Sequence, residues 1–158
     1  KDHIEGLNSH CKVSTLKNKS WEMNFNEYSS EMIFDCSDNF RTKYSLNEAC
    51  VNNDVPFCNA SVSDSDGQIA LFANKVDSHC CYNCLFPENG DIDANDCAEA
   101  GVLGPTVSLV ASLQALIGLK YLLNKFNDTE TIFRVSSKKI SIEKNKILSN
   151  SSCRLNKL

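Results

Sequence analysis

The strongest constraint on the fold is a strand–helix–strand pattern in the first half of the chain. The apolar run EMIFDC at 31–36 has the form of a strand buried on both faces. After the polar residues 37–39, FRTKYSLNEACVNN at 40–53 reads as an amphipathic helix. Two further apolar runs, at 55–62 and 67–73, are separated by a Ser-Asp-Gly turn. This order predicts an α/β sheet with crossover connections.

The rest of the chain extends the pattern without a second domain. Residues 1–10 have the form of a helix end, and CKVST at 11–15 alternates like a short strand. A long apolar helix begins at Gly104-Pro105, and alternation within 126–158 predicts antiparallel strands. We therefore predict one α/β domain over residues 1–158, with a mixed sheet and a C-terminal antiparallel extension.

Charge and hydropathy argue against two kinds of partner. A net charge of −4 repels a phosphate backbone, so no nucleic acid is expected. Residues 101–119 carry no charge and are long enough to cross a bilayer. They contain Thr106, Ser112 and Gln114 and begin with a Gly-Pro break, which favours a buried helix over a membrane span.

The nine cysteines do not look like a secreted disulfide framework, which would favour an even count. Cys36 and Cys58 lie in apolar runs and are predicted to be core residues, because free cysteine behaves as a small hydrophobe. No apolar signal-peptide core follows Lys1. We therefore expect a protein of the cytoplasm, which is a reducing compartment.

A loop rich in Cys, Asn and Asp is predicted at 74–104, and it contains a Cys81-x-x-Cys84 pair. Two thiolates at this spacing can grip one zinc ion, and Cys153 is a third candidate ligand. An unligated thiol pair or a redox dithiol is the alternative. Cys97 precedes a helix in a polar stretch, where a lowered pKa would suit a nucleophile, although an incidental exposed cysteine is the alternative.

Two carboxylates bracket the end of the first predicted strand, Asp35 and Asp38. Ligands of α/β proteins bind at the carboxyl edge of the sheet, where such a group can hold Mg²⁺. Spacing alone favours a simpler role for Asp38, as the N-cap of the following helix.

Three segments together resemble one protein family. DCSDNFRTKYSLNEAC at 35–50, CYNCLFPE at 81–88 and CAEAGVLGPTVSLVASLQALIGLKYLL at 97–123 have the order and spacing of the ThiF/MoeB/HesA proteins, bacterial relatives of ubiquitin-activating enzymes. The resemblance covers residues 1–155. It implies a Rossmann-like sheet, a homodimer, and adenylation of the C-terminal glycine of a ubiquitin-fold sulfur-carrier protein, using ATP and Mg²⁺. Sulfur transfer for thiamine or molybdopterin synthesis follows in this family.

The resemblance also implies roles for individual residues. Asp38 would bind Mg²⁺ and the nucleotide phosphates, with Asn39 in the same pocket. Cys97 matches the cysteine that forms a covalent acyl link in thiamine-type members. The residues that match ligands of a structural zinc ion are Cys81, Cys84 and Cys153.

The chain departs from the family pattern in three places. Asn156 stands where the last zinc-binding cysteine is expected. Lys43 occupies a position that is usually Arg, which would weaken a bidentate contact. The glycine-rich GxGGLG turn of the N-terminal nucleotide-binding strands is missing, so we expect no complete ATP site from these residues alone.

These departures leave two hypotheses of different kinds. The chain is either part of a larger or split adenylating enzyme, or a non-catalytic module that binds the carrier or dimerises. A stand-alone zinc or redox domain has little support beyond the CxxC pair.

Overall fold

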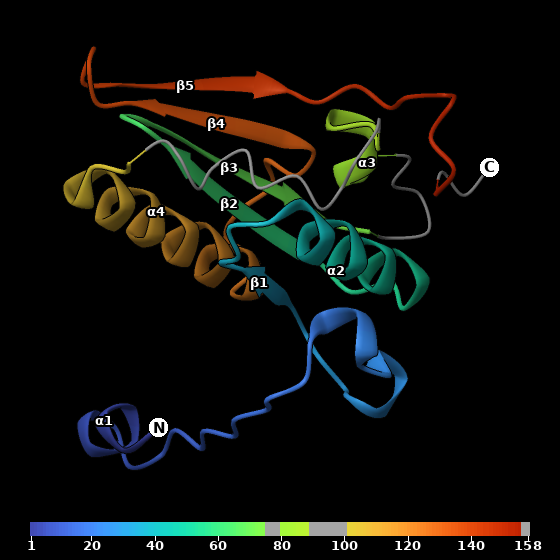
Figure 1. Ribbon diagram of the computed structural model, residues 1–158, viewed down its shortest axis with the longest axis vertical. Coiled ribbons are helices and arrows are strands. Elements are labelled where there is room, and N and C mark those ends of the chain that lie inside the picture. Colours follow the sequence, from blue (N-terminus) through green and yellow to red (C-terminus); the bar gives the residue numbers. More distant parts are fainter. Residues whose placement is uncertain (75–79, 89–100, 156–158) are drawn as a thin grey trace.

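A five-stranded sheet lies at the centre of the protein, with helices on both faces (Figure 1). This computed structural model describes residues 1–74, 80–88 and 101–155. The strands, in their order across the sheet, are β1 (Ile33–Asp35), β2 (Phe57–Ser63), β3 (Asp66–Phe72), β4 (Thr131–Ser136) and β5 (Ser141–Lys146). The helices are α1 (Asp2–Leu7), α2 (Phe40–Asn52), α3 (Tyr82–Leu85) and α4 (Gly104–Leu122), with two 3₁₀ turns at Ser20–Glu22 and Phe25–Glu27.

The predicted strand–helix–strand crossover is confirmed as β1–α2–β2. The two strands run parallel, and their register places Asp35 beside Asn59. Because both strands point the same way, their polar carboxyl-terminal residues meet at one edge of the sheet.

The remaining strands pair antiparallel, so the sheet is mixed as predicted. A tight turn joins β2 to β3 at Ser63 and Asp66, and β4 and β5 form the predicted C-terminal pair. The strand predicted at 11–15 is wrong, because no strand includes these residues. Residues 11, 12, 14 and 15 are exposed, so this segment buries too little apolar surface to stabilise a strand.

Side chains alternate between two cores on the two faces of the sheet. Helices α2 and α3 cover one face of the sheet and α4 covers the other (Figure 1). Phe57 and Phe72 belong to the core beneath α2 and α3, whereas Cys58, Ile69 and Leu71 belong to the core beneath α4. The central strands β2 and β3 are therefore buried on both sides, as their continuous apolar runs predict.

Helix α4 packs closely on the sheet but is buried along one side only. A Cβ added at Gly67 of β3 would lie 2.3 Å from Val110 Cγ2, so the helix approaches the strand at a point without a side chain. The prediction of a buried helix holds for this face alone, since Leu116 and Leu119 are 50 % and 57 % exposed. Among the described residues, α4 is the one helix long and apolar enough to span a membrane.

Two predictions about the first strand need correction. β1 is not buried on both faces, because Phe34 is 41 % exposed at the edge of the described sheet. Cys36 is exposed and does not belong to the core, since the strand ends at Asp35 and Cys36 falls in the following turn. Cys58 is fully buried, as predicted.

Candidate functional site

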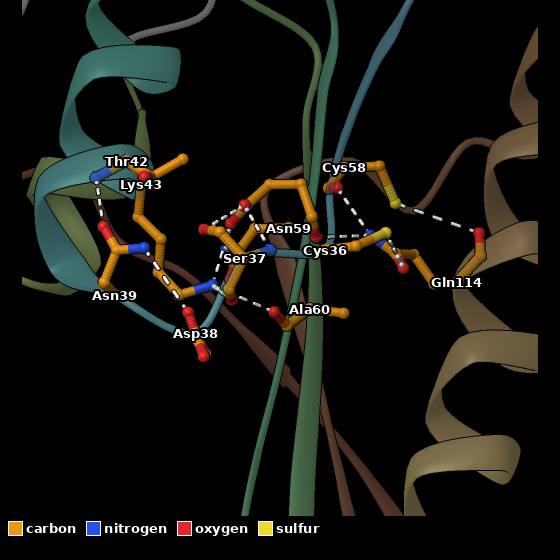
Figure 2. Close-up of polar contacts among 11 residues, drawn as sticks. Cys36, Ser37, Asp38, Asn39, Thr42, Lys43, Cys58, Asn59, Ala60 and Gln114 are labelled. Carbon is orange, nitrogen blue, oxygen red and sulfur yellow. Dashed lines mark hydrogen bonds and ion pairs between the residues drawn. The ribbon is translucent and has the colours of Figure 1, made fainter. Parts of the chain in front are cut away.

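The turn after β1 is organised by the carboxylate of Asp35, which is 1 % exposed. Its Oδ1 accepts hydrogen bonds from the backbone N–H and the hydroxyl of Ser37, at 2.9 and 2.6 Å. Its Oδ2 accepts from Lys43 Nζ at 2.8 Å and from Asn59 Nδ2 at 2.6 Å (Figure 2). A carboxylate offers about four acceptor positions, so these four donors leave none for a metal ion.

Lys43 enters this network from the buried side of α2 and is 4 % exposed. Besides Asp35, its ammonium donates to the carbonyl oxygens of Ser37 at 2.7 Å and of Ala60 at 3.1 Å. A buried charge is costly unless it is paired and hydrogen-bonded, and here both members of the ion pair are. Lys43 therefore neutralises Asp35 inside the protein.

Gln114 joins α4 to the ends of the two parallel strands. Gln114 is 4 % exposed. Its side-chain amide donates to the carbonyl oxygens of Asp35 and Cys58, each at 2.9 Å. The exposed thiol of Cys36 lies 3.6 Å from Gln114 Oε1 (Figure 2). One side chain thus spans β1, β2 and α4 at the edge where the polar residues gather.

Asp38 and Asn39 have separate roles, and the interpretation of Asp38 as the helix cap is corrected. The N-cap of α2 is Asn39, whose Oδ1 accepts the backbone N–H of Thr42 at 2.8 Å. Among the described residues, Asp38 receives only a 3.4 Å contact from Asn39 Nδ2. The exposed Asp38 carboxylate therefore keeps acceptor positions for a ligand.

A cavity of about 780 Å³ lies beside this turn, and Asp38 and Lys43 line it. This volume is within the usual range for small-molecule sites. Arg134 of β4 and Lys138, which follows β4, also line the cavity and contribute positive charge. Asn39 is not one of the described lining residues, because its side chain is turned to cap α2.

Three cysteines converge at a second place, between α3 and the C-terminal segment. Cys81 Sγ lies 4.0 Å from Cys84 Sγ and 3.6 Å from Cys153 Sγ, and all three sulfur atoms lie within 4.8 Å of one another. Fully buried Asn47 of α2 holds the short helix, since its Nδ2 donates to Asn83 Oδ1 at 2.8 Å. Folding thus brings the CxxC pair and Cys153 together, as proposed for a metal site.

The pKa values of the two CxxC thiols are shifted in opposite directions. Burial raises the pKa of Cys81 to about 12. Burial also acts to raise the pKa of Cys84, but hydrogen bonds with the backbone of Asn150 and of Cys81 outweigh it and lower that pKa. Three soft sulfur donors at these distances suit zinc, and a closed tetrahedral site needs a fourth.

Two residues of the sequence analysis lie outside the described residues. They are Cys97, the candidate nucleophile, and Asn156, which replaces the last expected zinc ligand.

A protein-family model described as the ThiF family matches residues 1–155. The chain belongs to the ThiF family. This confirms the resemblance drawn from the three motifs. The solved structures with the same fold include Escherichia coli MccB with ATP, at a TM-score of 0.75 and 17 % identity over 98 % of this chain and 48 % of that one. MccB with AMPCPP and selenomethionine MccA superimposes at 0.76, with 16 % identity, over 99 % and 49 % of the two chains. These structures confirm the Rossmann-type fold.

The curated relatives of this ThiF-family chain include two adenylyltransferases. The sulfur carrier protein ThiS adenylyltransferase of Escherichia coli is 37 % identical over 59 % of this chain and 36 % of its own length. The adenylyltransferase and sulfurtransferase MOCS3 of Dictyostelium discoideum is 35 % identical over 77 % of this chain and 29 % of its own length. The chain thus spans about a third of these curated relatives.

Sequence reasoning did not predict the buried hydrogen-bond network around Asp35. A polar side chain on the apolar side of a helix was the available signal, and it applies to Lys43 on α2 and Gln114 on α4. Their partners on β1 and β2 could not be named from spacing, because the contacts join residues distant in the chain.

Proposed function

We propose that this chain forms part of an enzyme that uses ATP to adenylate the C-terminal glycine of a ubiquitin-fold sulfur-carrier protein in the cytoplasm. In this reaction a carboxylate oxygen of the glycine attacks the α-phosphorus of ATP. A new P–O bond forms as the bond to the leaving pyrophosphate breaks. The adenylated carrier can then accept sulfur, for thiamine or molybdopterin synthesis.

The observation that carries this proposal is the difference between the two acids at the end of β1, Asp35 and Asp38. Asp35 is saturated by four donors, whereas Asp38 presents a carboxylate with free acceptor positions at the wall of the cavity. A hard oxygen donor of this kind suits Mg²⁺. When bound, the ion would neutralise phosphate charge as the leaving group departs.

The nucleotide site needs more residues than this chain supplies. We propose that the missing glycine-rich half is provided by a larger assembly, covalently or as a second polypeptide. Two features support this: β1 is an edge strand in the described sheet, and large apolar residues of α4 are exposed, including Leu109, Leu116 and Leu119. An exposed apolar face of this kind marks a protein interface.

We propose further roles for individual residues on the basis of the family pattern. Cys97 would form the covalent acyl link to the carrier. Asn39 would contribute to the nucleotide site by holding the start of α2. Cys81, Cys84 and Cys153 would hold a structural zinc ion that ties the C-terminal segment to α3.

The deciding experiment is carrier-dependent exchange between ATP and pyrophosphate. The chain is mixed with a sulfur carrier ending in Gly-Gly, and the glycine-rich half of a ThiF-family protein is added or omitted. We expect exchange only in the complete mixture, and Asp38→Ala should abolish it. The matched control is Asp128→Ala, which removes an exposed aspartate whose partner is Lys144 and should leave the rate unchanged.

The second candidate function is a non-catalytic module that binds the carrier or dimerises. The exposed apolar side of α4 favours it, since such a surface can serve docking without chemistry. Carrier binding without exchange, even with the glycine-rich half present, would establish this module and reject the enzyme.

A further inference from the structure

We propose that Lys43 is a positioning residue that aims the Asp38 carboxylate into the cavity. It acts through Asp35 and the Ser37 carbonyl, and it does not bind a ligand itself. Only the last step of this inference, its effect on catalysis, rests on the function proposed above.

The first argument is that Lys43 has no donor left for a ligand. An ammonium group has three N–H donors. Three oxygen atoms accept from Lys43 Nζ at 3.1 Å or less: Asp35 Oδ2, Ser37 O and Ala60 O. Although Lys43 lines the cavity, a phosphate or carboxylate entering it would have to displace one of these buried partners.

The second argument is that Asp38 lies between two anchored neighbours. Ser37 is held at three points, since its N–H and hydroxyl donate to Asp35 and its carbonyl accepts from Lys43. On the other side, Asn39 is held by its capping bond from the Thr42 N–H. Asp38 itself has no strong internal partner among the described residues, so its position follows from these anchors.

The third argument is that the charge of Lys43 keeps Ser37, the neighbour of Asp38 on the side of β1, in place. Asp35 is a buried carboxylate, and Asn59 and Ser37 are its other, neutral donors. Without the ammonium, the carboxylate becomes an unpaired buried charge, which is strongly unfavourable. The carboxylate would have to turn toward water, and this movement would release the Ser37 bonds.

The test compares hydrogen exchange of the Ser37 amide in this chain and its variants, so it needs no enzymatic activity. Lys43→Met should accelerate exchange at Ser37 by about tenfold or more, because a charge-assisted contact is lost. Lys43→Arg should restore protection. Amides of β4, which lies two strands from β2, should exchange at the wild-type rate in both variants.

If Lys43→Met does not fold, Lys43→Gln, which also removes the positive charge and leaves Asp35 in place, is measured instead. Wild-type protection of Ser37 in either folded variant would refute the positioning role. Equal acceleration at Ser37 and throughout β4 would also refute it, since that pattern indicates a global loss of stability.

The catalytic step is tested in the complete exchange assay. The folded variant should lower kcat or raise KM for Mg·ATP by about tenfold, as expected for a displaced metal-binding group, with an unchanged Kd for the carrier. Unchanged kinetics despite a loosened Ser37 would refute the link to Asp38. A wild-type enzyme without exchange would reject the proposed function, while the amide measurement would still decide the role of Lys43.

Discussion

Replacing Gln114 by leucine tests whether one side chain holds the sheet edge together. Gln114 lies in the buried side of α4, and its amide satisfies the carbonyl oxygens of Asp35 and Cys58 at 2.9 Å each. Leucine has a similar volume and fills the space, but it offers no donor. The substitution therefore separates the polar contacts of Gln114, which include the long contact with the Cys36 thiol, from the packing of the helix.

The expected loss of stability follows from the two lost hydrogen bonds. In the register of β1 and β2 both carbonyl oxygens also accept a backbone N–H of the neighbouring strand, so each keeps one partner in the variant. A hydrogen bond contributes about 0.5–1.5 kcal/mol net, and two of them give a destabilisation of about 1–3 kcal/mol. This is a measurable part of the stability of an ordinary domain, which is about 5–15 kcal/mol.

Urea unfolding measures this loss directly. Gln114→Leu should lower the midpoint and leave the m value unchanged, because the surface exposed on unfolding stays the same. Ser112→Ala is the matched control on α4, since it removes an exposed hydroxyl that donates to Ser108 O at 2.8 Å. The control should change stability by less than about 0.5 kcal/mol. A Gln114→Leu protein as stable as the control would refute the assigned role.

Two further predictions concern the cysteines. Cys153→Ser should reduce the zinc retained per chain after competition with a chelator, because it removes one of three thiolates. The control Cys11→Ser removes an exposed cysteine outside the cluster and should not change the zinc content. Equal zinc content in both variants would contradict the proposed site. Burial raises the pKa of Cys50 and of Cys58 to about 12 from the ordinary 9.0. Above the ordinary pKa the unfolded chain releases these protons and the folded chain keeps them, so stability is full below about pH 9 and falls as the pH rises toward 12. Thermal melts between these pH values should show the fall, and Cys58→Ala should make it shallower; an identical slope in the variant would exclude the thiol as a cause.

The local elements of this protein could be predicted from sequence because their signals are local. Helix α2 has a capping residue and an apolar side at helical spacing, and β4 and β5 alternate within a few residues. Local signals also misled in places. In the described part of the chain, no strand pairs with residues 11–15 in spite of their alternation. Cys36 has apolar neighbours in the sequence, but β1 ends before it.

The sequence by itself determined the family and the order of the elements, since motifs and periodicity are read along the chain. Only the tertiary structure decided which of two similar carboxylates has acceptor positions available to a ligand. Asp35 and Asp38 stand three residues apart, yet Asp35 is saturated by Lys43 and by Asn59, which is 24 positions away, and Asp38 is not. Cys153 likewise reaches Cys81 across 72 positions. Burial and pairing arise from contacts between distant segments, and no local pattern encodes them.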